Sequence, residues 1–395
     1  MIPFVTPTDM DGRKLINSTS RYLSEIGVST VRNSLIPAGS VMVSCIGSDM
    51  GKVVIAGEPC VTNQQINSIV VDTQFSSQFV YYNLSMRKAE LQHLASGGST
   101  MPILNKGNFS EIKIDIPSLS EQIQIARLLS SFDDRITLLR ETNATLESIA
   151  QALFKSWFVD FDPVRAKMEG RAPEGMDEAT AALFPDSFEE SELGVVPKRW
   201  RVGTINDLCE SITNGGTPSR SKKEFWDGGK TPWYKTGEFS DGFLLEPSER
   251  ISDLALQSTA AKLLPEYSVL MAIYASPTVG RLGILTEPAT FNQACTGMIP
   301  HKNVGTWFLY WTLYFGRDWF NSRANGAAQQ NISKAIVAGY KTVIPPDSVL
   351  AKFNDLAGPI HEKIRSNCQR TKCLSELRDT LLPRLISGQL LLPTN

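Results

Sequence analysis

The segment IPSLSEQIQIARLLSSFDDRITLLRETNATLESIAQALFKSWF, residues 116–158, decides the fold that we expect for this chain. Its apolar side chains recur at alternating spacings of four and three residues, the heptad pattern of a helix that packs against another helix. Pro117 precedes the pattern, and Ser120 with Glu121 supplies capping oxygens for its first turn. We predict a helix over residues 118–158, about 60 Å long at 1.5 Å per residue. Its contact positions are Phe132, Ile136, Leu139, Leu146, Leu153 and Trp157, with Asn143 as a polar interruption.

A second helix of the same kind is predicted over residues 346–388, because a shift of 228 residues carries the first pattern onto a second one. For a single stripe, packing on the core of its own domain is an equally good alternative. Two matched stripes favour contact with each other, and a second helix that returns alongside the first runs antiparallel to it. Its contact positions are Ile360, Ile364, Leu374, Leu381 and Leu385, with Asn367, Thr371 and Arg378 as polar members.

An internal repeat extends this match over most of the chain. The run LIPAGSVMV from Leu35 aligns with LLPEYSVLM from Leu263, and GEPCVTNQQ from Gly57 aligns with TEPATFNQA from Thr286. Farther on, GGSTMPILNK from Gly97 aligns with NGAAQQNISK from Asn325. Short apolar runs separated by glycine and proline predict strands with some helices, and so an α+β domain.

The predicted architecture is therefore a pseudo-two-fold repeat of two similar α+β domains, joined by two long helices that form an antiparallel coiled coil. The helices would be a spacer that holds the domains at a fixed separation and in opposite orientations. The boundaries that we predict are a first domain at 1–117, a helix at 118–158, an acidic connector at 159–196, a second domain at 197–345, a helix at 346–388 and a tail at 389–395.

The composition is that of an ordinary globular protein, with 395 residues, 42% hydrophobic and 20% charged. Six scattered cysteines without a CxxC pair, and three histidines, argue against a zinc site or a disulfide framework. No segment has the pattern of a signal peptide or the roughly 20 apolar residues of a membrane span. We expect a cytoplasmic protein with reduced thiols.

The net charge of −2 conceals an uneven distribution. Residues 197–345 hold 16 lysines and arginines against 12 acidic residues, whereas residues 159–196 hold 3 against 10. The acidic connector therefore masks a mild basic excess in the second domain, although an ordinary solvated surface explains that excess equally well.

Motifs of catalysis are missing from the sequence. The run GGKTP at residues 228–232 resembles the end of a phosphate-binding loop, but Glu224 stands where that loop requires glycine. G-x-S-x-G, H-E-x-x-H and G-x-G-x-x-G do not occur. We therefore predict a protein that binds, with no catalytic residue and no metal site. Two related domains on a rigid spacer suit a target with two separated half-sites, and B-DNA presents major-groove faces about every 10 base pairs.

Three stretches of the chain resemble the specificity subunit of type I restriction-modification systems. They are the run from Ile116 to Gly170, LRDTLLPRLISGQL from Leu377, and ITNGGTPSRSKKEFWDGGKTPWYKTGEF from Ile212. The resemblance covers nearly the whole chain. It implies two target recognition domains that alternate with two conserved helices, and a bipartite target in double-stranded DNA. It also implies partners, namely methyltransferase subunits that bind S-adenosylmethionine and motor-nuclease subunits that use ATP and Mg²⁺, so that those cofactors belong to the partners.

Positions that differ between the repeats are the better candidates for DNA recognition, since positions that agree, such as Gly51 and Gly280, more often maintain the shared fold. Arginine and lysine suit guanine or phosphate, and asparagine and glutamine suit adenine. Trp226, Trp233 and Tyr234 suit sugar contacts, although the aromatic core is the simpler interpretation. The DNA-binding candidates are Ser219, Arg220, Lys222, Lys223, Lys235, Thr236, Asn325, Gln329 and Gln330 in the second domain, with Ser99 and Thr100 in the first.

The first repeat lacks a counterpart of the leading segment PKRWRVGTINDLCESITNGGTPSRSKKEFWDGGK, residues 197–230. Either this copy is truncated, or the first domain folds with an exposed sheet edge. Two further hypotheses follow: a degenerate copy that assembles with partners as an interaction scaffold without recognising a DNA sequence, and an enzyme that methylates or cleaves DNA alone.

Overall fold

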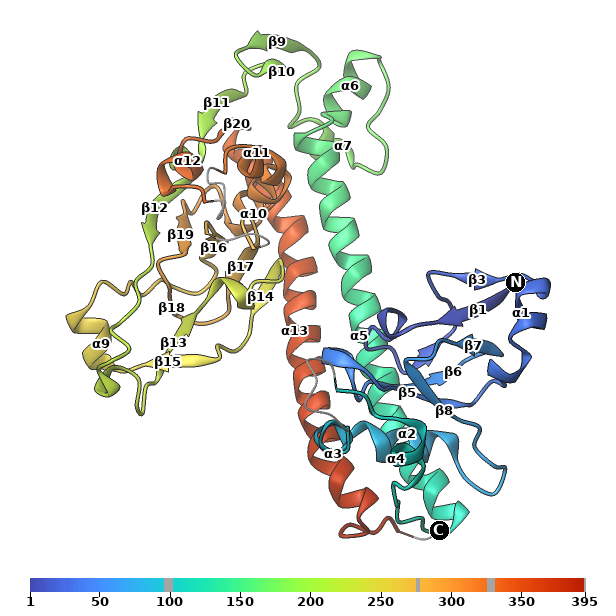
Figure 1. The fold of residues 1–395 in the computed structure, drawn as a ribbon. Helices are drawn as coiled ribbons and strands as arrows, with labels where there is room; N and C mark the ends of the chain where they lie inside the picture. The colour runs from blue at the N-terminus through green and yellow to red at the C-terminus, as the bar shows by residue number, and fades with distance from the viewer. Residues whose placement is uncertain (96–101, 275–277, 325–330, 394–395) are drawn as a thin grey trace. The chain divides into compact units, whose positions relative to one another are not determined.

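The computed structural model describes residues 1–95, 102–274, 278–324 and 331–393 (Figure 1). The chain divides into two compact units, which we treat separately. Unit 1 comprises Met1–Leu138 with Thr371–Asn395, and unit 2 comprises Leu139–Arg370. Both units contain a sheet domain and a part of each of the two longest helices, α5 (Leu119–Phe158) and α13 (Asp347–Ile386).

Unit 1 contains two four-stranded sheets, with the strand orders β3-β1-β7-β4 and β2-β6-β5-β8. The parallel pairs β1 with β7 and β2 with β6 alternate with antiparallel neighbours, so both sheets are mixed. The strands are β1 (Ile2–Val5), β2 (Leu15–Ile16), β3 (Tyr22–Leu23), β4 (Leu35–Ile36), β5 (Val41–Ser44), β6 (Val53–Ala56), β7 (Cys60–Thr62) and β8 (Ile66–Ile69). The helices are η1 (Pro7–Asp9), α1 (Glu25–Thr30), η2 (Arg32–Ser34), η3 (Gly47–Asp49), α2 (Ser77–Ser85), α3 (Lys88–His93) and α4 (Lys106–Ser110).

Unit 2 repeats this plan with additions. Its large sheet has the order β12-β19-β16-β17-β14, and a smaller one has the order β15-β13-β18. Its strands are β9 (Phe188–Ser191), β10 (Gly194–Pro197), β11 (Arg201–Thr204), β12 (Cys209–Asn214), β13 (Thr231–Tyr234), β14 (Gly242–Leu244), β15 (Glu249–Ile251), β16 (Val269–Ala272), β17 (Leu282–Leu285), β18 (Thr290–Phe291), β19 (Cys295–Pro300) and β20 (Lys341–Ile344). Its helices are α6 (Asp162–Met168), α7 (Glu178–Ala181), α8 (Ile205–Leu208), η4 (Lys223–Phe225), η5 (Thr236–Glu238), α9 (Asp253–Ser258), α10 (Thr306–Phe315), α11 (Arg317–Ser322) and α12 (Lys334–Ala338).

The two units contain the same strand pairs. In unit 1, β1 runs parallel to β7 and antiparallel to β3, just as β13 in unit 2 runs parallel to β18 and antiparallel to β15. The ladder β2-β6-β5-β8 likewise matches β14-β17-β16-β19. The predicted α+β repeat is therefore confirmed. The predicted connector, residues 159–196, lies within unit 2 and contains α6 and α7 and a hairpin of β9 with β10.

The long helices lie antiparallel within each unit. In unit 2, the Asn367 amide nitrogen lies 2.8 Å from the Asn143 amide oxygen, and the rings of Phe154 and Phe353 lie 5.8 Å apart. Along the contact, the residue numbers therefore increase on α5 while they decrease on α13. Unit 1 continues the same order, because Asp133 binds Arg378 at 2.7 Å and Leu129 packs in one cluster with Leu382. The predicted antiparallel pairing is confirmed.

The first turn of α5 confirms one of the two predicted capping residues, Glu121, which pairs with Ser118 and not with Ser120. The Ser118 hydroxyl and main-chain N–H both donate to the Glu121 carboxylate, at 2.6 and 3.0 Å, and the Glu121 N–H donates back to the Ser118 hydroxyl. This reciprocal arrangement is a capping box. The predicted cap at Ser120 is wrong because the helix begins at Leu119, so Ser120 already lies inside it.

Candidate nucleic-acid interface

The loop that follows β12 carries four of the nine predicted DNA-binding residues of unit 2, namely Ser219, Arg220, Lys222 and Lys223. Its path is fixed by Gly215 and Gly216, where an added Cβ atom would lie 2.2 Å from the Phe291 carbonyl oxygen and 2.7 Å from the main chain of Ala260. The Gly216 carbonyl accepts a hydrogen bond from the Trp233 indole at 2.9 Å. Glycine is required at both positions because the main chain approaches neighbouring main chain too closely for a side chain.

Arg220 holds this loop against the rest of the domain. Its guanidinium makes a two-pronged ion pair with Glu249 on β15, with Nη2 donating to Oε2 at 3.0 Å. The guanidinium carbon also lies 3.7 Å from the centre of the Trp226 ring, which packs edge-on against Trp233. Bidentate pairing and stacking restrict the rotamers of a long side chain. Arg220 therefore organises the loop while about half of its side chain, 51%, stays accessible to solvent.

Glu249 also forms an ion pair with a second cationic side chain, from a different segment of the chain. The Lys235 ammonium donates to the same carboxylate at 2.9 Å. Hydrogen bonds from Arg220 first, and from Lys235 second, lower the pKa of Glu249 to about 2. The structure thus brings two predicted segments, Ser219–Lys223 and Lys235–Thr236, onto one carboxylate. We call Arg220, Lys235 and Glu249 the clamp; at neutral pH it carries one net positive charge.

The remaining predicted cations of the loop face solvent. Lys222 and Lys223 are exposed, and the Lys222 ammonium lies 5.0 Å from the centre of the buried Phe225 ring. Among the residues that the structure describes, neither ammonium group pairs with a carboxylate. Ser219 is also exposed and hydrogen-bonds the Ser221 hydroxyl at 2.9 Å, whereas Thr236 is half-buried at the start of η5. Lys222 and Lys223 are therefore the groups best placed to meet a phosphate.

The aromatic candidates divide by burial. Trp233 and Tyr234 lie in the core, and the Tyr234 hydroxyl donates to the Leu244 carbonyl at 3.1 Å. Trp226 is half-buried and already stacked by Arg220. Trp233 and Tyr234 are therefore core residues, as the simpler of the two interpretations had it.

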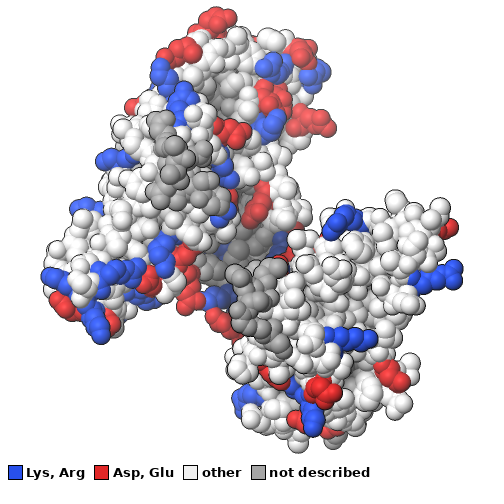
Figure 2. All heavy atoms as spheres, in the orientation of Figure 1, with Lys and Arg blue, Asp and Glu red and all other residues white. Residues whose placement is uncertain are grey.

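The surface around the loop is mixed in charge. Figure 2 shows lysine and arginine atoms interleaved with acidic ones at the end of unit 2 that holds β13, β15 and α9. Here Arg250 pairs with Glu287 at 3.6 Å, in addition to the clamp. Over residues 215–262, seven lysines and arginines stand against seven acidic residues, so this segment has no net positive charge.

The second group of predicted DNA-binding residues falls outside the part of the chain that the structure describes. These positions are Asn325, Gln329 and Gln330 in unit 2, with Ser99 and Thr100 in unit 1. The two segments occupy equivalent places in the repeat.

The predicted helix contacts are buried to different degrees, each within its own unit. Asn143 and Asn367 are both buried and hydrogen-bonded to each other. Such a polar pair in an apolar seam fixes the register of two helices. Of the predicted contact residues, Ile136, Leu139, Trp157, Ile364 and Leu385 are buried, and Phe132, Leu146, Leu153, Ile360, Leu374 and Leu381 are half-buried.

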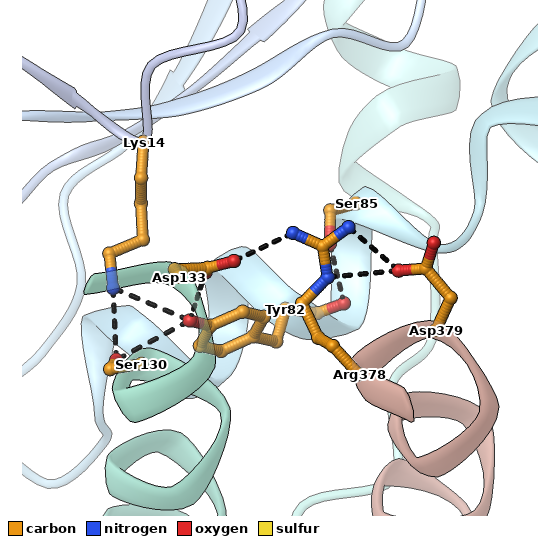
Figure 3. Close-up of polar contacts among 7 residues, drawn as sticks. All are labelled: Lys14, Tyr82, Ser85, Ser130, Asp133, Arg378 and Asp379. Atoms are coloured by element: carbon orange, nitrogen blue, oxygen red, sulfur yellow. Dashed lines mark hydrogen bonds and ion pairs between the residues drawn. The ribbon is translucent and has the colours of Figure 1, made fainter. Parts of the chain in front are cut away.

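A polar cluster, of which Arg378 was predicted as a helix contact and the other members were not, attaches the sheet domain of unit 1 to its helices (Figure 3). Asp133 on α5 accepts hydrogen bonds from Tyr82 on α2 and from Arg378 on α13. Lys14 reaches Ser130 at 2.9 Å, and burial lowers the pKa of its ammonium group. Burial first, and the Asp133 hydrogen bond second, raise the pKa of Tyr82. One carboxylate and its neighbours tie together three helices and the loop before β2, so the cluster orients the domain on its helices.

Positions that agree in both repeats maintain the same turns. Gly51 and Gly280 both adopt left-handed conformations, with φ of 84° and 81°. Asn63 and Asn292 both accept main-chain hydrogen bonds from residues two positions later, at 3.0 and 3.2 Å. Shared residues at these sites shape the fold.

Neither metal chemistry nor membrane insertion has a visible basis in the described part of the chain. There, no group of three or more histidine, cysteine or acidic side chains is arranged to hold a metal ion. No helix in the same residues combines the length and the apolar character that crossing a membrane requires.

The fold and the site define a class: a repeat protein of two related α+β domains, each packed on part of the same pair of antiparallel helices, with exposed lysines on a loop of the second domain. The family described as the type I restriction modification DNA specificity domain matches residues 1–148 and 197–349. The chain therefore belongs to the family of type I restriction-modification specificity subunits. These are DNA-recognition subunits and not catalytic ones, so the predicted resemblance is confirmed.

Individual relatives agree with this assignment. The chain is 29% identical to the type I restriction enzyme MjaIX specificity subunit of Methanocaldococcus jannaschii, over 98% of this chain and 87% of that protein. It is 30% identical to the HindI specificity subunit of Haemophilus influenzae, over 75% of this chain and 72% of the relative. The crystal structure of an S subunit from M. genitalium has the same fold, with a TM-score of 0.58 at 16% identity, over 91% of this chain and 84% of that one.

Proposed function

We propose that this chain recognises a bipartite DNA target, with one part of the target assigned to each sheet domain. The observation that carries the proposal is the repeat itself, since both units present the same strand pairs with different side chains at equivalent places. A shared scaffold with different surface residues is what recognition of two different half-sites requires. The two long helices serve as the spacer between the domains.

Both domains offer a cation at the same place on the scaffold. In unit 2 the clamp residue Glu249 lies opposite Trp233 on the neighbouring strand. In unit 1 the equivalent neighbour of Phe4 is Arg21, whose carbonyl accepts the Phe4 N–H and whose guanidinium lies 5.5 Å from the Phe4 ring. One net positive charge therefore stands at this place in each unit, supplied by Arg21 alone or by the clamp. These groups suit phosphate contacts that orient each domain.

The helices suit the docking of partner subunits. We assign to these partners the methyltransferase and restriction activities, with S-adenosylmethionine, ATP and Mg²⁺ bound there and none of them in this chain. A cytoplasmic location accords with this role, because cellular DNA and the partners meet there.

Salt-dependent DNA binding tests the proposal through the exposed cations. Three single variants test this: Lys222→Ala, Lys223→Ala and Arg21→Ala. Each removes about one phosphate contact, so each should reduce the magnitude of the negative slope of log K against log salt concentration by about 1. Fluorescence anisotropy with duplex DNA, over a series of salt concentrations, measures the slope. Lys302→Ala, at an exposed lysine on the turn after β19, is the matched control and should leave it unchanged.

A second function, an interaction scaffold without sequence recognition, is favoured by one observation. Three cations near the loop of unit 2, Arg220, Lys235 and Arg250, already pair with carboxylates of the same unit. The two functions differ in competition experiments: a specificity subunit retains its preference over random-sequence DNA when salt suppresses phosphate contacts, and a scaffold has none.

A further inference from the structure

A cavity of about 410 Å³ lies within unit 2, where α5, α10 and α13 meet the start of β14. All the described residues that line it belong to Leu139–Arg370. Its volume falls in the range of about 300–1,000 Å³ that small-molecule sites occupy. The described DNA-binding candidates do not line the cavity, so recognition of DNA does not explain it.

Two polar side chains of the cavity wall are almost completely buried and lack hydrogen-bond partners. Trp311 on α10 is 3% exposed, and His361 on α13 is 4% exposed. Within the described residues, neither Trp311 Nε1 nor His361 Nε2 forms a hydrogen bond. An unpaired polar group in the interior is unfavourable, so two such groups in the wall of one cavity indicate a bound molecule.

The two nitrogen atoms require opposite partners. The Trp311 indole can only donate. His361 Nδ1 lies 2.7 Å from the Ala357 carbonyl oxygen of its own helix, so Nδ1 carries the proton and Nε2 accepts when the ring is neutral. Burial lowers the pKa of His361 to about 4, and the ring is therefore neutral at pH 7. A bound molecule must accept from Trp311 and donate to His361.

The rest of the wall favours a cation on a carbon skeleton. Glu147 on α5 is exposed and pairs with no lysine or arginine in the part of the chain that the structure describes. Asp241 also lines the cavity, but its carboxylate binds the Arg317 guanidinium. Two carboxylates and one guanidinium leave one net negative charge. Tyr310 and Tyr314 add aromatic surface, which attracts cations and packs against carbon.

We propose that this cavity binds a small amino alcohol, a molecule with an ammonium group and hydroxyl groups on a compact carbon skeleton. The ammonium group donates to the Glu147 carboxylate and to His361 Nε2. A hydroxyl oxygen accepts from the Trp311 indole, and the carbon skeleton packs against Tyr310 and Tyr314. Because α5, α10 and α13 each contribute a group, the bound molecule joins the two long helices to the sheet domain within unit 2.

Nuclear magnetic resonance of the full chain, with isotope-labelled tryptophan, tests the proposal. The probe is D-glucosamine, and the indole signal that disappears in Trp311→Phe is assigned to Trp311. We expect glucosamine to shift this signal saturably. D-glucose lacks the ammonium group and hexylamine lacks the hydroxyl groups, so each should bind about tenfold more weakly.

Glu147→Gln tests the contribution of the charge. The variant keeps the size of the side chain and loses the ion pair with the ammonium group, so glucosamine should bind about fivefold more weakly. Glu141→Gln, at another exposed glutamate of α5, is the matched control and should bind as the unmodified chain does. Since both side chains are exposed, both variants should fold normally.

Several results would overturn the proposal. The first is a Trp311 signal that does not change, or changes without saturation, as glucosamine is added. A shift confined to other tryptophans would place the amine elsewhere on the chain. Equal binding of glucose or hexylamine would contradict the need for both groups, and unchanged binding by Glu147→Gln would contradict the role of the carboxylate.

Discussion

Equivalent places on the two sheet domains carry different side chains but the same net charge. Opposite the inner aromatic residue, unit 1 has Arg21, while unit 2 has Glu249 between Arg220 and Lys235. Conserved turns such as those at Gly51 and Gly280 show that the backbone is constrained. The comparison teaches that the scaffold dictates where a cation stands, and that each unit supplies it with different chemistry.

The sheet edges give the largest expected difference between the units. Thr213→Pro removes the N–H of β12 that faces Gly297, and we expect unit 2 to lose about 3 kcal/mol of stability. The Thr213 hydroxyl has no hydrogen-bond partner in the described residues, so the loss reports on the main chain. Ser68→Pro, at the equivalent of Gly297 on β8, the edge strand of its sheet in the described residues, should change stability by about 0.5 kcal/mol or less. Hydrogen exchange resolved by unit measures both values, and equal losses would contradict the difference in edges.

The helix pair gives the next effect. Asn143→Leu leaves the buried Asn367 amide without its partner, and the free energy of unfolding should fall by about 1–3 kcal/mol. Replacing both residues by leucine removes the unpaired group, so the double variant should be more stable than the single one. Denaturant unfolding measures the series. Losses that simply add would show that the two amides do not depend on each other.

A smaller, pH-dependent effect distinguishes the clamp from Arg21. Hydrogen bonds from Arg220 and Lys235 lower the pKa of Glu249 to about 2, below its value of about 4.3 in an unfolded chain. The unfolded state therefore binds more protons between these values, and the clamp's contribution to stability is complete above about pH 4.3 and lost as pH falls toward 2. Glu249→Gln should remove this dependence. Thermal unfolding of both proteins across this range measures it, and parallel curves would be inconsistent with the clamp.

Local patterns were sufficient to predict the long helices and the repeat. Heptad spacing and the 228-residue offset indicated the contact positions near Ile136 and Ile364, which are buried. These patterns did not indicate that Arg21 and Glu249 lie at equivalent places, because strand pairing sets each of them beside an aromatic residue that is distant in sequence. Phe4 is 17 residues from Arg21, whereas Trp233 is 16 from Glu249, so a fixed offset does not align them. The contacts of the cluster around Asp133 were not predicted for the same reason, since its members come from three helices and the loop before β2.

The most direct test of the account is the methylation pattern of DNA in cells that contain this chain with its partner subunits. The unmodified chain should yield a methylated sequence in two parts with a fixed gap. Exchanging the segment Ser219–Lys223 for that of a relative should alter one part and leave both the other part and the gap unchanged. A contiguous target, or a simultaneous change in both parts, would contradict the assignment of one half-site to each domain.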